Sequence, residues 1–270
     1  MIDQTLQLRA QYIEQIAQQA GDLAMRYFKQ WSTLNIEQKK SPQDLVSEAD
    51  RAVEAFIRSQ ILREFPKDNI LGEEQDDVVN GGEYTWIIDP IDGTYAFLHG
   101  IPLWCVSVAV LYKGQPYLGV IVDPNHHEVY SAVKNGGAFC NGQPITAIKN
   151  ANLQSGSVAF GIDKGVRAQI AEQFIHRSIE HQIHIARTYT CALNMAWVAS
   201  GRIMAAFYPY VSSWDYCAGL ILVEEAGGWH NDPLKDDGLH KGGALLATAK
   251  DVYDNLAEIC QIEFLDNLEK

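Results

Sequence analysis

The sequence predicts an α+β protein built from two closely packed halves. Two amphipathic helical segments open the chain, short strand-like segments follow them, and a second alternation of strands and helices begins near residue 150. The chain has 270 residues, which is long for one core and short for two independent ones. We therefore expect residues 1–145 and 146–270 to form two halves that pack tightly and fold as one unit.

We expect the first half to begin with two helices. Residues 3–31 carry apolar side chains at helical spacing, and residues 46–65 form a second amphipathic pattern. Ser47 could cap the second helix, with Asp50 three residues later as the acid of a capping box. Pro66 and the polar residues after it end this helix.

Strands dominate the rest of the first half, where apolar runs are separated by turn residues. These runs span residues 86–88, 106–112, 117–123, 129–133 and 137–140. They predict an antiparallel meander with the two helices on one side. In the second half we expect strands at 157–161, 183–186, 203–208 and 244–248, and helices at 166–180, 191–200, 214–225 and 251–260.

The formal net charge of −13 excludes some partners. An acidic surface repels nucleic acid and anionic membranes, so we expect neither as a partner. It would also repel a phosphate ester, unless local positive charge compensates. The sequence has few basic clusters, and bound metal cations would resolve this conflict.

The cysteines and the first residues indicate the compartment. The five cysteines include no pair at CxxC spacing, and most lie in apolar runs, as expected of free thiols in a reducing environment. Residues 1–10 lack the apolar core of a signal peptide, and no run of eighteen apolar residues occurs. We expect a cytoplasmic protein.

The most informative segment is the hexapeptide from Asp89 to Thr94, which directly follows an apolar strand. Its two acids, Asp89 and Asp92, can point to one place from a sharp loop, and carboxylate oxygens are what Mg²⁺ takes. Gly93 and Thr94 would offer backbone N–H groups and a hydroxyl to a phosphate. The alternative is a β-turn in which both acids merely bond backbone amides.

Three further acids favour the metal interpretation. Glu73 follows a short apolar pair, Asp215 begins an apolar helix, and Asp50 lies on an apolar helical face. Each has an alternative, since Asp215 could be only an N-cap and Asp50 could pair with Arg51 or a lysine. Taken together, several buried acids with few cations nearby in sequence favour a bound metal, because a lone buried carboxylate is very unstable.

Four blocks of the sequence resemble the inositol monophosphatase family. They are residues 39–50, 71–74, 86–94 and 214–228, which occur in the family's order. These magnesium-dependent, lithium-sensitive phosphatases also include histidinol-phosphate phosphatases and fructose-1,6-bisphosphatases. The resemblance implies a layered α-β-α-β-α sandwich, the usual homodimer, and a phosphoric monoester hydrolase that acts through metal-activated water without a covalent intermediate.

The resemblance also implies metal ligands. Glu73, Asp89 and the carbonyl of Ile91 would hold one Mg²⁺, and Asp89, Asp92 and Asp215 would hold a second. Glu73 would help to position a third ion, and Mn²⁺ could substitute for Mg²⁺. Asp89 would thus bridge two ions.

Further roles follow from the same resemblance. Thr94 would help Glu73 to activate the attacking water, Asp50 would support Thr94 from behind, and backbone N–H groups of Gly93 and Thr94 would bind phosphate. Residues expected to contact the phosphate or the rest of the substrate are Asp92, Gly93, Thr94, Tyr189, Thr190, Cys191, Tyr208 and Asp215.

The chain departs from the inositol-type pattern near the substrate. Tyr208 stands where those enzymes carry a glutamate that grips a substrate hydroxyl, and Tyr189 stands where a glycine is usual. A phenol supplies neither the charge nor the double acceptor of a carboxylate. Residues 101–104 look closer to histidinol-phosphate phosphatases. These changes put inositol phosphate in doubt as the favoured substrate and leave the metal site intact.

The sequence therefore predicts Mg²⁺-dependent hydrolysis of a small inositol-phosphate-like, sugar or polyol phosphate, with histidinol phosphate as the alternative. A bisphosphate or phosphoadenosine substrate is less favoured, because Lys164, Arg167 and Arg187 are the only evident cations early in the second half. A non-catalytic interaction protein that kept the fold is the third reading, and the complete set of acids argues against it.

Overall fold

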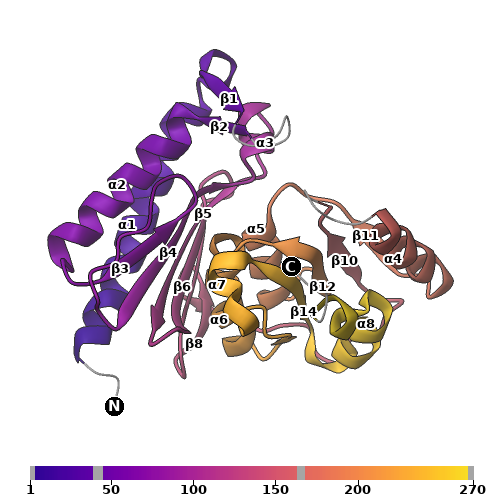
Figure 1. Cartoon of the computed structure of the whole chain (residues 1–270). Coiled ribbons are helices and arrows are strands. Elements are labelled where there is room, and N and C mark those ends of the chain that lie inside the picture. Colours follow the sequence, from indigo (N-terminus) through magenta and orange to yellow (C-terminus); the bar gives the residue numbers. More distant parts are fainter. Residues whose placement is uncertain (1–3, 39–44, 163–167, 267–270) are drawn as a thin grey trace.

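The computed structural model describes residues 4–38, 45–162 and 168–266 and has five layers (Figure 1). Helices α1 (Gln4–Phe28) and α2 (Glu48–Glu64) cover one face of a seven-stranded sheet, and α5 (Cys191–Ala199) and α6 (Ser213–Glu225) cover the other. A five-stranded sheet packs on the far side of α5 and α6, with α4 (Ala168–Glu180) and α8 (Tyr253–Cys260) outside it. This arrangement confirms the predicted layered sandwich.

The first sheet has the strand order β3-β4-β5-β6-β7-β8-β9. Its strands are β3 (Asn69–Gly72), β4 (Tyr84–Asp92), β5 (Cys105–Tyr112), β6 (Gln115–Asp123), β7 (Glu128–Val133), β8 (Gly137–Cys140) and β9 (Gln143–Pro144). All neighbours are antiparallel except β3 and β4. The predicted meander is confirmed, and the parallel edge strand β3, which ends beside Glu73, is an addition to it.

The second sheet has the order β11-β10-β12-β14-β13. Its strands are β10 (Ser157–Phe160), β11 (His184–Ala186), β12 (Ala205–Val211), β13 (Trp229–His230) and β14 (Gly243–Thr248). Strand β10 is parallel to β11 and β12, whereas β14 is antiparallel to its neighbours. One buried cluster contains Ile87 of the first sheet and Leu245 of the second, so a shared core crosses between them. The exact division into two halves stays a prediction.

Helix α6 forms the centre of this core. Almost every residue from Tyr216 to Val223 is fully buried, as expected for a helix with a sheet on each side. It approaches β6 closely at Gly119, where an added Cβ would lie 2.4 Å from the carbonyl oxygen of Ala218. The first turn of α6 therefore lies at a fixed position beside the first sheet, and this turn carries Asp215.

The predicted segments agree with the structure to within a few residues. The first helix ends at Phe28 instead of residue 31, and the strand predicted at 203–208 is β12. Short elements that we did not predict, besides β3, β9 and β13 of the two sheets, are η1 (Trp31–Thr33), β1 (Ile36–Gln38), β2 (Leu45–Ser47), α3 (Thr94–Leu98), η2 (Lys235–Asp237), α7 (Gly238–Lys241), η3 (Lys250–Val252) and α9 (Ile262–Asp266). Residues 39–44 of the first sequence block, the start of the helix predicted at 166–180, Lys164 and Arg167 lie outside the described residues.

Among the residues that the structure describes, no helix combines the length and apolar character needed to cross a bilayer.

Candidate active site

A bulge at the end of β4 shapes the acidic loop. Asp89 lies opposite Ser107 and Asp92 lies opposite Cys105, so β4 carries one residue more than its partner between these pairs. Bulges of this kind bend a strand and re-aim its side chains. Gly93 follows with φ of 98°, and an added Cβ would lie 2.8 Å from the carbonyl oxygen of Leu103, so glycine is required there for both reasons.

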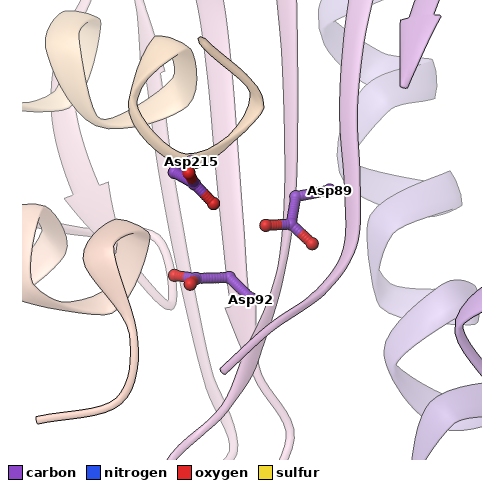
Figure 2. Close-up of side chains that lie close together, drawn as sticks. All are labelled: Asp89, Asp92 and Asp215. Atoms are coloured by element: carbon purple, nitrogen blue, oxygen red, sulfur yellow. The ribbon is translucent and has the colours of Figure 1, made fainter. Parts of the chain in front are cut away.

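Three acids converge beside this bulge. Figure 2 shows Asp89 and Asp92 from β4 facing Asp215 from the first turn of α6, and one carboxylate oxygen of each lies within 4.8 Å of the others. Asp89 and Asp92 are buried, and Asp215 is half-buried. The predicted meeting of acids from distant parts of the sequence is therefore observed for these three residues.

Asp89 carries the clearest sign of a missing partner. Its Oδ1 accepts a hydrogen bond from the backbone N–H of Ile91 at 3.0 Å, whereas its buried Oδ2 has no hydrogen-bond partner among the described residues. Burial, then the charges of Glu73 and Asp92, raises the pKa of Asp89 well above its usual value. An orphaned oxygen among several acids fits an oxygen-binding divalent cation such as Mg²⁺.

Asp92 lies against the start of α5. Its carboxylate accepts hydrogen bonds from the Thr190 hydroxyl, from the N–H of Cys191 at 3.2 Å and from the N–H of Ala192 at 2.6 Å. Burial raises the pKa of Asp92 to about 6, although the Thr190 and amide donors oppose the rise. Asp92 does bond backbone amides, as the β-turn alternative proposed, but they belong to a distant helix.

Asp215 and Glu73 reach the same region from two other elements. Ser212 is the N-cap of α6, and its N–H donates to Asp215 Oδ2 at 3.2 Å, so Asp215 is the third helical residue and not the cap. Glu73 follows β3, and its N–H donates to the carbonyl of Ile88 at 3.3 Å. It lies outside the cluster of three acids, but its charge raises the pKa of Asp89.

Thr94 and Asp50 lie beside the acidic loop. The Thr94 hydroxyl donates to the carbonyl of Ile91 at 3.1 Å and lies 3.5 Å from Asp50 Oδ1. Asp50 is fully buried, its Oδ2 accepts from the N–H of Ser47 at 2.8 Å, and burial raises its pKa to about 6. The predicted capping box is confirmed. Arg51 instead bonds an exposed glutamate, so the alternative pairing of Asp50 with Arg51 is wrong.

Two buried charges hold the segment that follows Glu73, and we did not predict them. Glu54 is fully buried and accepts from the N–H groups of Glu74 at 2.8 Å and Gln75 at 3.1 Å. Arg58 donates to Glu54 at 2.7 Å and to the carbonyls of residues 75 and 76 at 2.9 Å. The signal was present, because both charges lie on the same apolar helical face as Asp50 at four-residue spacing.

A cavity of about 510 Å³ opens beside Asp92 and Asp215. Its lining includes all four residues of the second half that we expected near the substrate besides Asp215, namely Tyr189, Thr190, Cys191 and Tyr208. It also includes residues that we did not predict, namely Tyr95, Gly161, Ile162, Arg187, Thr188 and Val211. Arg187 and Thr188 directly precede Tyr189 in the chain, whereas Tyr95 comes from α3, Gly161 and Ile162 follow β10, and Val211 ends β12, so tertiary packing brings these segments together.

Comparison with known proteins agrees with this geometry. A model of the inositol monophosphatase family matches residues 6–263. An inositol-1-monophosphatase from Rhizobium meliloti (strain 1021) is 31% identical over 245 residues, which are 90% of this chain and 92% of that protein. A histidinol-phosphatase from Chlorobaculum parvum is 36% identical over 214 residues, which are 79% of this chain and 82% of that protein.

A solved structure shows the same fold. The extragenic suppressor protein suhB from Bartonella henselae superposes with a TM-score of 0.85 and 30% identity, covering 92% of this chain and 96% of that one. Because the family match extends over nearly the whole chain, and curated relatives match over most of their own length, this chain belongs to the inositol monophosphatase family and is a phosphoric monoester hydrolase.

Proposed function

We propose that this chain hydrolyses a small phosphate monoester in a Mg²⁺-dependent reaction, with water as the nucleophile and no covalent intermediate. The observation that carries the proposal is the buried carboxylate of Asp89, which has an unsatisfied oxygen and two further acids beside it. A buried anion persists only where something compensates its charge. A divalent cation does so, and it also attracts a phosphate to an acidic protein.

In this proposal Asp89, Asp92, Asp215, Glu73 and the carbonyl of Ile91 hold two to three Mg²⁺ ions, which Mn²⁺ could replace. All of them offer oxygen, the ligand atom that these hard cations prefer. When bound, the ions supply positive charge that activates water and stabilises the phosphoryl group and the leaving alkoxide.

The chain's own residues orient the reactants. Thr94 and Glu73 position the attacking water, and the Asp50 carboxylate, 3.5 Å from the Thr94 hydroxyl, can accept a hydrogen bond from it. Burial raises the pKa of Asp50 to about 6, which is close to neutral pH, the range in which a carboxylate works best as a proton acceptor. The N–H groups of Gly93 and Thr94 bind the phosphate at the start of α3.

The alcohol part of the substrate lies in the cavity beside Asp92, where Tyr189, Thr190, Cys191 and Tyr208 contact it. Inositol-phosphate-like, sugar and polyol phosphates are the candidates, and histidinol phosphate is the alternative, which the relative from Chlorobaculum parvum favours. A bisphosphate is less favoured, because Arg187 is the only cation among the described residues that line the cavity.

A phosphate-release screen tests this function. With Mg²⁺, the purified protein should release phosphate from at least one member of a panel of inositol, histidinol, sugar and polyol phosphates. EDTA should stop the reaction, and Asp89→Asn should abolish it, whereas Asp254→Asn, at an exposed position on α8, should have no effect. Phosphate release that persists in EDTA, or no release from any ester, would contradict the proposal.

We further propose a homodimer in the cytoplasm. Four of the five cysteines are buried in the fold and the fifth, Cys140, is half-buried, as is common for thiols of proteins in a reducing compartment. The dimer rests on the family resemblance alone. Light scattering on the purified protein would test it, and a monomer at micromolar concentration would contradict it.

A further inference from the structure

Three tyrosines, Tyr95, Tyr189 and Tyr208, line the cavity that also contains Asp92 and Asp215. Tyr208 stands where inositol-type enzymes carry a glutamate that binds a substrate hydroxyl, and its own hydroxyl is bonded on both sides by the protein. It accepts from Asn194 Nδ2 at 2.6 Å and donates to the carbonyl of Thr190 at 3.1 Å. The residue as a whole is 4% exposed. This position therefore presents an aromatic surface and no acceptor for the hydroxyl groups of a polyol.

Two other tyrosines keep open surface at the same cavity. Tyr95 comes from α3 and Tyr189 from the loop before α5, and their rings stack with centroids 5.4 Å apart and planes inclined by 18°. We call them the tyrosine pair. The side chains are 49% and 43% exposed, and both line the cavity. Exposed apolar surface beside a binding site is a common mark of ligand contact.

The tyrosine pair is held in place before any ligand arrives. His99 stacks on Tyr95 with centroids 4.1 Å apart, and its Nδ1 lies 2.7 Å from the backbone carbonyl oxygen of Tyr95. Tyr189 directly precedes Thr190, the N-cap of α5, which is bonded to Asp92. Fixed rings lose little conformational entropy on binding, so they can contribute most of their contact energy to a ligand.

We propose that the tyrosine pair selects monoesters whose alcohol part carries a flat aromatic or heteroaromatic ring, in preference to polyol phosphates. This inference rests on the proposed function and adds the class of alcohol to it. A ring of the substrate would stack on the pair, while its phosphate lies toward Asp92 and Asp215 at the other end of the cavity. Stacking of two aromatic rings changes a binding constant by roughly two- to twelvefold.

Two esters of similar size provide the test. We would compare 2-phenylethyl phosphate with 2-cyclohexylethyl phosphate, because they share the chain length and apolar character but only the first has a π-face. The wild-type protein with Mg²⁺ should show a kcat/KM about fivefold higher for the aromatic ester, mainly through a lower KM. Glycerol phosphate should be a poorer substrate than either.

The variants connect this preference to the tyrosine pair. In Tyr95→Leu and Tyr189→Leu the ratio between the two esters should fall towards one, whereas Tyr95→Phe and Tyr189→Phe should keep it. Trp229→Leu serves as the matched control, because Trp229 is an equally exposed aromatic residue on β13, outside the residues that line the cavity. Thermal unfolding of each variant checks that the fold is retained, which the exposure of both tyrosines favours.

The outcomes are distinguishable. Equal efficiency on the two esters in the wild type, or a preference that survives both leucine substitutions, would overturn the role of the tyrosine pair and leave the phosphatase function standing. No phosphate release from any ester would instead overturn the proposed function, and the inference would fall with it.

Discussion

The first sheet and the segments packed against it contain two kinds of buried acid, which differ in how their charge is compensated. Asp68, 2% exposed, accepts from Arg9 at 2.7 and 2.8 Å and from the indole N–H of Trp86 at 2.8 Å. Glu54 likewise has Arg58 and two backbone N–H groups. Asp89 is as deeply buried, but its Oδ2 has no partner among the described residues and other acids surround it.

This difference separates acids that hold the fold from acids that await a ligand. A buried carboxylate is tolerated when the chain itself supplies a cation and donors, and such a pair contributes to structure. Where the chain supplies like charges instead, the ionised apo protein keeps an unfavourable arrangement that an external cation or protonation relieves. The comparison therefore supports the proposed metal-binding role of Asp89 by its surroundings and not by its burial.

The largest expected effect comes from Asp89→Asn, which removes a functional acid. Activity with Mg²⁺ should fall by about a thousandfold or more, because the site would lose one of its proposed metal ligands. In EDTA the same variant should be more stable than the wild type by about 1 kcal/mol, since a buried charge next to like charges disappears. Urea unfolding of both proteins in EDTA measures the second effect. If Asp89→Asn were less stable than the wild type in EDTA, the distinction between the two kinds of buried acid would be contradicted.

Asp68→Asn removes a structural acid and should have the opposite profile. The Arg9 guanidinium would stay buried without its anion, and breaking such a pair costs about 3 kcal/mol of unfolding free energy. Activity at a temperature where the variant is folded should remain near wild type. Adding Arg9→Met should recover part of the lost stability. If Asp68→Asn and the wild type had the same free energy of unfolding, the charge of Asp68 would not contribute to stability through its pair with Arg9, and the prediction would be contradicted.

Glu54→Gln lies between the two classes, because Glu54 is structural but holds the segment that follows Glu73. We expect Glu54 to be a positioning residue, so the variant should require about tenfold more Mg²⁺ for half-maximal activity. Excess Mg²⁺ should restore kcat, which a merely destabilised protein would not show. Glu64→Gln, at an exposed position of the same helix, is the control. An unchanged Mg²⁺ requirement would assign Glu54 to stability alone.

The sequence predicted the functional acids better than the structural ones. Asp89, Asp92 and Asp215 belong to short segments whose residue types and order indicate chemistry, and the strand before Asp89 fixes where the loop begins. The layers followed from apolar periodicity, whereas the division into halves and the assigned roles stay predictions. The partner of Asp68 is Arg9, 59 residues away, and the partner of Tyr95 is Tyr189. No local pattern predicts such pairs, because tertiary packing alone brings them together.

The smallest expected effect concerns Glu224, a paired acid near the surface at the end of α6. The His230 ring, whose Nε2 lies 3.3 Å from Glu224 Oε1, and then the Lys134 ammonium, which donates a hydrogen bond at 2.9 Å, lower the pKa of Glu224 to about 2. Because this pKa lies below the ordinary value of 4.5, the pairing stabilises the fold above about pH 4.5, and the contribution disappears as pH falls towards 2. The side chain is 40% exposed, so solvent screening keeps the contribution below about 1 kcal/mol. Urea unfolding of the wild type and Glu224→Gln at pH 7, 5, 4 and 3 should show a gap that narrows with acid, whereas a constant gap would indicate lost packing instead of lost charge.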